Sequence, residues 1–139
     1  MKAIAELQHI TQDLDGVSHA QQAKLACEGG ARWVQFRSKI GTALERQAPA
    51  LLVLAVCKEY HAALIINDDA AMAKAIGAHG VHLGQDDMSP VEAREILGSA
   101  AIICGTANTF EQVQQMTEDG VDYVGVGPFR HTETKANLS

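Results

Sequence analysis

Short apolar runs alternate with segments of helical apolar spacing along the whole of this 139-residue chain. The runs are mostly continuous rather than alternating, which is typical of strands that are buried on both faces of a sheet. They predict six strands, at residues 4–10, 33–37, 63–67, 80–83, 101–105 and 123–126. Because no linker or low-complexity stretch divides the chain, the pattern predicts a single domain over residues 1–139.

Helical segments separate the predicted strands, at residues 19–28, 45–60 and 70–76, after residue 89 and around residues 110–116. Gly77 and Gly120 follow two of these segments and are expected to end them. Ser89-Pro90-Val91-Glu92 has the sequence of a capping box with proline at the first helical position. Regular alternation of strands and helices predicts a parallel sheet with right-handed crossovers.

Two α/β architectures fit this alternation. An open doubly wound sheet is complete with five or six strands. A closed (β/α)₈ barrel of the TIM type usually takes about 250 residues and rarely fewer than about 200. Length alone therefore favours the open sheet, and a barrel would require a chain truncated after its sixth strand.

Composition narrows the class of partner. With 47% hydrophobic and 20% charged residues, the chain has an ordinary globular composition. The net charge of −6 and the lack of a basic patch argue against a nucleic-acid partner. An anionic small molecule stays compatible, because a few lysine and arginine side chains can focus a local positive field. The sequence is also compatible with a homo-oligomer.

Cysteine usage and hydropathy indicate the compartment. Cys27, Cys57 and Cys104 are odd in number and show no ligand spacing, so buried reduced thiols are expected. No apolar run reaches membrane-spanning length, and the first residues lack the apolar core of a signal peptide. These features predict a cytoplasmic protein without a membrane partner.

Polar side chains gather at the C-terminal ends of the predicted strands, where parallel sheets place their ligands. Strand alternation puts Gln35, Arg37 and Lys39 on one side of the second strand. Such long polar side chains are costly to bury without a partner, but at a barrel mouth they form a cationic cluster suited to a phosphate or pyrophosphate. The alternative is an edge strand with a solvated face.

Acidic residues follow the next two strands. Asn67-Asp68-Asp69 ends the third strand, and Asp86-Asp87 comes shortly after the fourth. One residue of the first group is expected to be only a helix N-cap. Carboxylates from neighbouring strand ends can share Mg²⁺, which takes the rest of its ligands from water and phosphate oxygens. Beside the cationic strand end, they suggest a site for a magnesium-bound diphosphate.

The last strands add hydroxyl groups and one more cation. Thr106 follows the fifth strand, and Thr109 is expected to cap the next helix. After the turn at Gly127-Pro128, the chain carries Thr132, Thr134 and Lys135 with the spacing T-x-T-K. This spacing is also common in surface loops. Taken alone, it is weak evidence of function.

The six histidines show no metal-ligand spacing. His82 lies within the fourth strand and is expected to be a hydrogen-bonded core residue rather than a general base. His131 is the one histidine placed to touch a ligand.

Together these residues make the sequence similar to the thiamine-phosphate synthase family over nearly all of the chain. Four motifs at successive strand ends carry the resemblance: Gln35-Phe36-Arg37-Ser38-Lys39, Ile66-Asn67-Asp68, Gly80 to Asp87 (GVHLGQDD), and Gly127-Pro128 through Thr132-Glu133-Thr134-Lys135. The resemblance implies a TIM (β/α)₈ barrel and overturns the preference for the open sheet that came from length. Relatives continue with two further βα units, so the resemblance predicts a barrel truncated after the sixth strand.

The resemblance also implies a reaction and a site. In the family, hydroxymethylpyrimidine diphosphate loses its diphosphate with the help of Mg²⁺, and the resulting pyrimidine methyl cation is captured by the nitrogen of thiazole phosphate. The pyrimidine diphosphate would be held by Gln35, Arg37, Lys39, Asn67 and Lys135, of which Arg37, Lys39 and Lys135 would be catalytic. Asp68 and Asp87 would bind Mg²⁺. Thr106 takes the place of a family serine, and Thr132 and Thr134 would meet the thiazole phosphate.

Several positions depart from the family pattern. Ser38 stands where many relatives have an acid, Asn108 where they often have histidine, and Arg130-His131 replaces a Phe-Pro pair. Two alternatives follow for function. The related thiazole tautomerase shares the fold but needs neither diphosphate departure nor Mg²⁺. A chain of only 139 residues could instead be a non-catalytic fragment that binds anions.

Overall fold

The computed structural model describes residue 2 and residues 4–128, which form a six-stranded parallel sheet and five helices. The strands are β1 (His9–Ile10), β2 (Trp33–Phe36), β3 (Ala63–Asn67), β4 (Gly80–Leu83), β5 (Ile102–Ala107) and β6 (Tyr123–Val126). The helices are α1 (His19–Glu28), α2 (Ala43–Glu59), α3 (Ala70–Ile76), α4 (Pro90–Leu97) and α5 (Phe110–Glu118).

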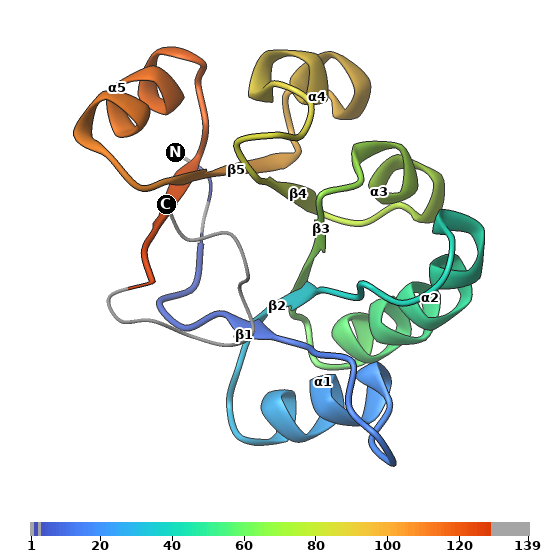
Figure 1. Ribbon diagram of the computed structural model, residues 1–139. Helices are drawn as coiled ribbons and strands as arrows, with labels where there is room; N and C mark the ends of the chain where they lie inside the picture. The colour runs from blue at the N-terminus through green and yellow to red at the C-terminus, as the bar shows by residue number, and fades with distance from the viewer. Residues whose placement is uncertain (1, 3, 129–139) are drawn as a thin grey trace.

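The strand order distinguishes the two architectures. The strands lie side by side in the order β1-β2-β3-β4-β5-β6, and each pairs in parallel with its sequence neighbour. In a doubly wound sheet the order of the strands reverses near the middle of the sheet. In a barrel the strands follow one another in sequence order. The sheet curls, and the helices lie along its outer face (Figure 1). The expectation of a partial TIM-type barrel is thus confirmed, and the preference for an open sheet was wrong.

The predicted boundaries of α1, α3, β3, β4 and β6 agree with the structure. The first strand differs most, because only His9–Ile10 is strand where the apolar run predicted residues 4–10. Within the described residues β1 pairs on one side alone, with β2, and this ladder covers two residue pairs. The fifth strand is longer than predicted and reaches Ala107, because β6 pairs with it up to Ala107↔Val126.

Side-chain caps fix where the helices begin. Ser89 and Thr109 each accept a hydrogen bond from the backbone three residues later, as predicted, and both form capping boxes, of which only the one at Ser89 was predicted. Asp69 caps α3 by accepting from Met72 N at 2.8 Å, so it is the one residue of the Asn67-Asp68-Asp69 group with that role. Thr42 caps α2 in the same way, and the helix therefore begins at Ala43, two residues before its predicted start.

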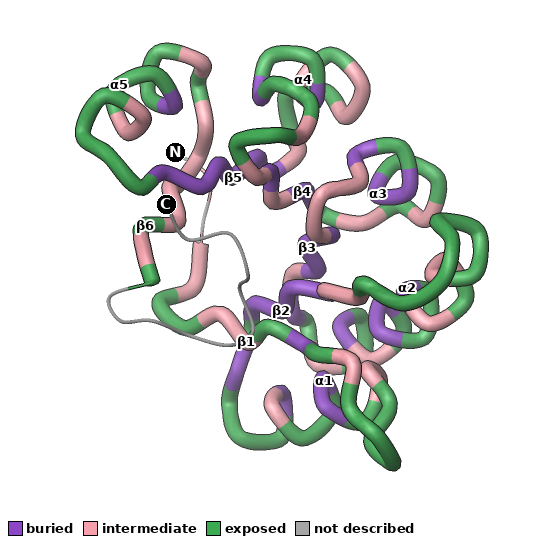
Figure 2. Tube along the Cα trace, in the orientation of Figure 1, coloured by how far each residue is buried: buried purple, intermediate pink, exposed green. Residues whose placement is uncertain are grey.

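The core lies between the outer face of the sheet and the helices. Figure 2 shows that the buried positions follow β2, β3, β4 and β5 and recur along the helices that cover them. Fully buried side chains include Val34, Phe36, Leu64, Ile66 and Ile103. The three cysteines are free and buried, which confirms their predicted state. Among the described helices, none combines the length and apolarity needed to cross a lipid bilayer.

Gly80 is a position where the sheet tolerates no side chain. A Cβ atom there would lie 1.9 Å from the carbonyl oxygen of Ile102 on the neighbouring strand. The clash would be with a backbone atom, so the two paired strands would have to shift to relieve it. We therefore expect Gly80→Ala to lower the free energy of unfolding by about 1–3 kcal/mol or more. Gly29→Ala is the matched control, since its Cβ would meet nothing closer than 3.4 Å. Urea denaturation measures both variants, and an equal stability of the two would contradict the packing of β4 on β5.

Candidate active site

The carboxyl ends of β2, β3, β4 and β5 bring most of the predicted site residues to one edge of the sheet. Arg37 and Lys39 follow β2, Asn67 is the last residue of β3, and Asp68 comes directly after it. Because these strands are consecutive neighbours, the residues that follow them lie next to one another in space.

Lys39, Asp68 and Asp87 form a continuous polar chain across three strand ends. Lys39 Nζ donates to Asp68 Oδ2 at 2.5 Å. The carboxyl group of Asp87 is hydrogen bonded to that of Asp68. The structure therefore brings together one predicted cation and both predicted metal ligands.

The two carboxyl groups differ in their ionisation. Burial raises the pKa of Asp87, and the hydrogen bond to Asp68 raises it further. Burial also opposes ionisation of Asp68, but the hydrogen bonds from Lys39 and Asp87 outweigh it and lower its pKa. Asp68 is thus the acceptor, and Asp87 is the member of the pair that retains a proton more readily. A cation bound between the two carboxylates would offset their mutual repulsion, so that both could be ionised.

The backbone presents both carboxylates at the edge. Asp68 has a φ of 66°, in the left-handed region, and its N–H donates to the carbonyl oxygen of His82 on β4 at 2.7 Å. Asp and Asn adopt that region more readily than most residues. Asp87 Oδ2 accepts from Gly84 N at 2.7 Å, and a Cβ at Gly84 would lie 2.9 Å from the same oxygen. A side chain at position 84 would therefore displace the Asp87 carboxylate from this hydrogen bond.

Thr106 lies at the next strand end and is buried. Its Oγ1 is 2.8 Å from His82 Nε2, and its carbonyl oxygen accepts from the side-chain amide of Gln85. His82 is hydrogen bonded as predicted, although it is only half-buried. Gln85 was not predicted as a site residue, yet it links the β4 turn to β5.

Gln35 lies deeper than Lys39. It is fully buried within the sheet, where its amide donates to Gln8 Oε1 at 3.1 Å, and Gln8 Nε2 donates to Tyr123 OH at 3.1 Å. The strand alternation correctly predicted that Gln35 faces away from Val34 and Phe36, which belong to the core under the helices. Gln35 therefore belongs to a separate hydrogen-bonded chain with Gln8 and Tyr123, and the hydrogen bond that its amide donates goes to Gln8 rather than to Lys39, Asp68 or Asp87.

Four predicted residues of the last loop fall outside the described part of the chain, namely His131, Thr132, Thr134 and Lys135. Their predicted contacts with substrate stay predictions.

A set of residues before and within α1 was missed. Thr11 and Asp13 follow β1 and accept hydrogen bonds from the segment after β2, and His19, which begins α1, is hydrogen bonded to both of them. Thr11 and Asp13 stand at a strand end like the other site residues, so the same positional rule applied to the first strand identifies them. His19 follows eight residues after Thr11, and no spacing in the sequence points to it.

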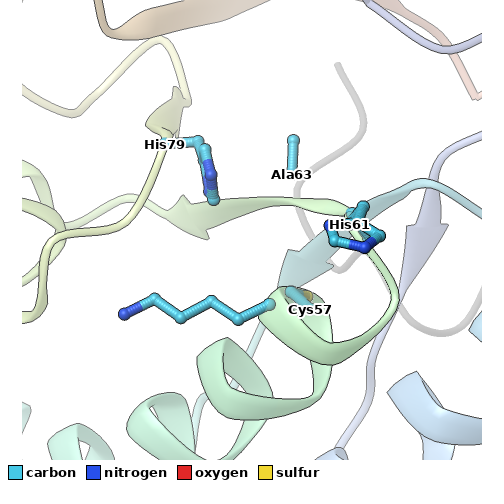
Figure 3. A pocket seen from close by; sticks show the side chains of 6 residues that line it. Cys57, His61, Ala63 and His79 are labelled. Carbon is cyan, nitrogen blue, oxygen red and sulfur yellow. The ribbon is translucent and has the colours of Figure 1, made fainter.

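A hollow of about 380 Å³ lies at the opposite end of the sheet, where β3 and β4 begin (Figure 3). It is lined by Cys57, Lys58, His61, Ala62, Ala63 and His79. His79 Nδ1 accepts from Leu64 N at 3.0 Å, and burial together with the nearby Lys58 charge lowers its pKa. Burial raises the pKa of the Cys57 thiol to about 12. The histidine is neutral and bonded to the backbone, and the thiol is un-ionised. We therefore assign these side chains a structural role rather than a catalytic one.

The metal-binding capacity of the edge rests on two carboxylates. Over residues 2 and 4–128, no group of three or more histidine, cysteine, aspartate or glutamate side chains is arranged to hold a metal ion. Mg²⁺ commonly takes only one or two carboxylates and completes its octahedron with water and substrate phosphates. The Asp68–Asp87 pair fits that donor set.

Comparison with known proteins gives consistent results. A family model described as thiamine monophosphate synthase matches residues 7–139. The thiamine-phosphate synthase of Bacteroides thetaiotaomicron is 46% identical over 136 residues, covering 98% of this chain and 65% of that protein. The one from Bacteroides fragilis is 47% identical over 133 residues, covering 96% and 65%. The solved structure of thiamine phosphate pyrophosphorylase from Pyrococcus furiosus superposes with a TM-score of 0.79 at 28% identity, covering 87% of this chain and 59% of that one.

Proposed function

The chain belongs to the thiamine monophosphate synthase family, and from that premise we propose that the whole protein joins hydroxymethylpyrimidine diphosphate and thiazole phosphate to give thiamine phosphate and pyrophosphate. The chain spans 65% of the length of each of these two Bacteroides relatives. The proposal therefore concerns the protein as a whole. In it, the described residues would form the part of the active site that binds the pyrimidine diphosphate.

The single observation that carries the proposal is the Lys39–Asp68–Asp87 chain at neighbouring strand ends. In a dissociative substitution, negative charge grows on the departing diphosphate. Fixed positive charge lowers the barrier most when it is already in place at that position. Asp68 fixes the ammonium of Lys39 at the strand ends, and Arg37 lies two residues before Lys39, so both would face the diphosphate of a bound substrate.

We further propose that Asp68 and Asp87 hold Mg²⁺. When bound, the ion would supply charge neutralisation for the leaving diphosphate. The fit rests on the hydrogen-bonded carboxyl pair, whose like charges disfavour full ionisation of both groups until a cation lies between them. Asn67 would contact the pyrimidine diphosphate. The hydroxyl of Thr106 is oriented by His82 and would contact substrate in place of a family serine.

Lys135, Thr132 and Thr134 belong to the same proposal by motif alone. Lys135 would add a second ammonium at the diphosphate, and the two threonines would meet the thiazole phosphate. Gln35 would act from within the sheet, through the polar chain that it forms with Gln8. We also propose a cytoplasmic location, in keeping with three free, buried thiols.

Asp87→Asn tests the metal site without relying on turnover. We expect the affinity of the whole protein for Mg²⁺, measured by calorimetry in the presence of inorganic pyrophosphate, to fall by about 10–100-fold, because the variant loses one charged ligand. Asp86→Asn is the matched control, since Asp86 is exposed in the same turn. An unchanged affinity in Asp87→Asn would remove Asp87 from the site.

The same protein separates the synthase from the thiazole tautomerase. Pyrophosphate release that requires Mg²⁺ supports the synthase. Isomerisation of a thiazole phosphate without added metal, and without pyrophosphate release, would show the tautomerase instead.

A further inference from the structure

Two residues after β1, Thr11 and Asp13, hold the three residues that follow β2. Thr11 Oγ1 accepts a hydrogen bond from Arg37 N at 3.3 Å. Asp13 Oδ1 accepts from Ser38 Oγ at 2.7 Å, and Asp13 Oδ2 accepts from Lys39 N at 2.7 Å. Each of the three successive residues after the strand is thus fixed by a side chain from β1's own strand end.

His19 joins the two acceptors. Its Nδ1 lies 2.6 Å from Thr11 Oγ1, and its Nε2 donates to Asp13 Oδ1 at 2.9 Å. The imidazole packs on Phe36 with ring centroids 4.7 Å apart, and its side chain is only 12% exposed. The carboxylate of Asp13 therefore accepts one hydrogen bond from the imidazole of His19 and two from the segment after β2. We call Thr11, Asp13 and His19 the β1 clamp.

Asp13 is ionised in this arrangement. Burial works against its charge, but the hydrogen bonds from Lys39 N, Ser38 and His19 outweigh burial and lower the pKa of Asp13. An ionised carboxylate accepts hydrogen bonds without donating any, which suits a site with three donors.

We propose that Asp13 is a positioning residue for Lys39. By fixing the Lys39 backbone, it places the ammonium where it meets Asp68 beside Asp87. The Lys39 side chain is long and 54% exposed, so its geometry depends on where its backbone is anchored. A group held in place before the substrate arrives binds a departing diphosphate at a lower entropic cost. The inference rests on the proposed function, because it assigns Asp13 a role at the same diphosphate site.

Asp13→Asn in the whole protein tests this role, with calorimetric binding of inorganic pyrophosphate in the presence of Mg²⁺ as the readout. Asparagine keeps the shape, but its amide nitrogen donates, so it cannot accept from all three donors. We expect about tenfold weaker binding, which corresponds to the loss of roughly one charge-assisted hydrogen bond. Asp15→Asn is the matched control, because Asp15 is an exposed aspartate in the same segment and should bind as the unaltered protein does.

Repeating the substitution in a Lys39→Met background separates positioning from a general loss of structure. If Asp13 acts through Lys39, Asp13→Asn weakens binding no further once the ammonium is absent. The same loss in both backgrounds, or unchanged binding by Asp13→Asn alone, would overturn the proposal. If Asp13→Asn does not fold, Ser38→Ala decides: about threefold weaker binding that vanishes in the Lys39→Met background supports the clamp, and unchanged binding overturns it.

The two proposals fail differently. If the unaltered protein does not bind pyrophosphate with Mg²⁺, the proposed function fails and the role of Asp13 fails with it. If the unaltered protein binds and the variants bind equally well, only the role of Asp13 is overturned.

Discussion

Lys39→Met is expected to lower kcat for the proposed formation of thiamine phosphate by about 10²–10³-fold, because the proposal places this cation at the leaving diphosphate. Methionine keeps an unbranched, flexible side chain and deletes the ammonium that donates to Asp68 Oδ2. Since the charge on the diphosphate grows toward the transition state, the loss should appear in kcat as well as in kcat/KM. Steady-state kinetics of the whole protein with both substrates measures it.

Lys24→Met is the control for this prediction. Lys24 is an exposed lysine on α1, and its ammonium lies 4.0 Å from Glu28 on the helix surface. The same chemical change there should alter kcat by no more than about twofold, as is usual for exposed ion pairs. A Lys39→Met protein with the kinetics of the Lys24→Met protein would show that the ammonium of Lys39 takes no part in the reaction.

Asp68→Asn is expected to have an effect of similar size, about 10²–10³-fold on kcat, together with at least a tenfold rise in the Mg²⁺ concentration that gives half the maximal rate. Asp68 is the acceptor for both Lys39 and Asp87, so its charge organises the whole polar chain. Asparagine adopts the left-handed backbone conformation that this position requires, with a φ of 66°. The loss of activity should therefore occur in a folded protein.

Asp69→Asn is the matched control, one residue away. Asp69 caps α3 by accepting from Met72 N at 2.8 Å, and asparagine is an equally good N-cap residue. The control should keep both its stability and its Mg²⁺ requirement. If Asp68→Asn titrates with Mg²⁺ as Asp69→Asn does, the carboxylate of Asp68 is not part of a metal site.

Local patterns in the sequence predicted most of the fold. Apolar runs located β3, β4 and β6, and capping residues such as Ser89 and Thr109 located helix starts, because both signals act over a few neighbouring residues. The extent of β1 could not be predicted in this way, because a ladder also needs a partner strand, and residues 4–8 have the same apolar character as His9–Ile10.

The choice between the open sheet and the barrel shows a different limit. Strand order depends on how crossovers wind around the sheet, and the alternation of strands and helices is the same in both architectures. Length favoured the open sheet, and the motifs at four strand ends favoured the barrel. The sequential order from β1 to β6 agrees with the motifs.

The candidate site was predictable where a polar residue lies within a few residues of the C-terminal end of a strand. That rule found Lys39, Asp68 and Asp87, which the structure joins into one chain. It could not find His19, because a helix residue reaches the site only through the way α1 packs on Phe36. Nor could it show that Gln35 bonds to Gln8, since that contact depends on the register between β1 and β2.

The most direct test of the account is a crystal structure of the whole protein with inorganic pyrophosphate, in which Mn²⁺ replaces Mg²⁺ as an anomalous scatterer. The account predicts one Mn²⁺ peak bonded to carboxylate oxygens of both Asp68 and Asp87 and to pyrophosphate oxygens, with the Lys39 ammonium in contact with the same pyrophosphate. Pyrophosphate and Mn²⁺ bound away from these three side chains, with the strand ends ordered as described, would contradict it.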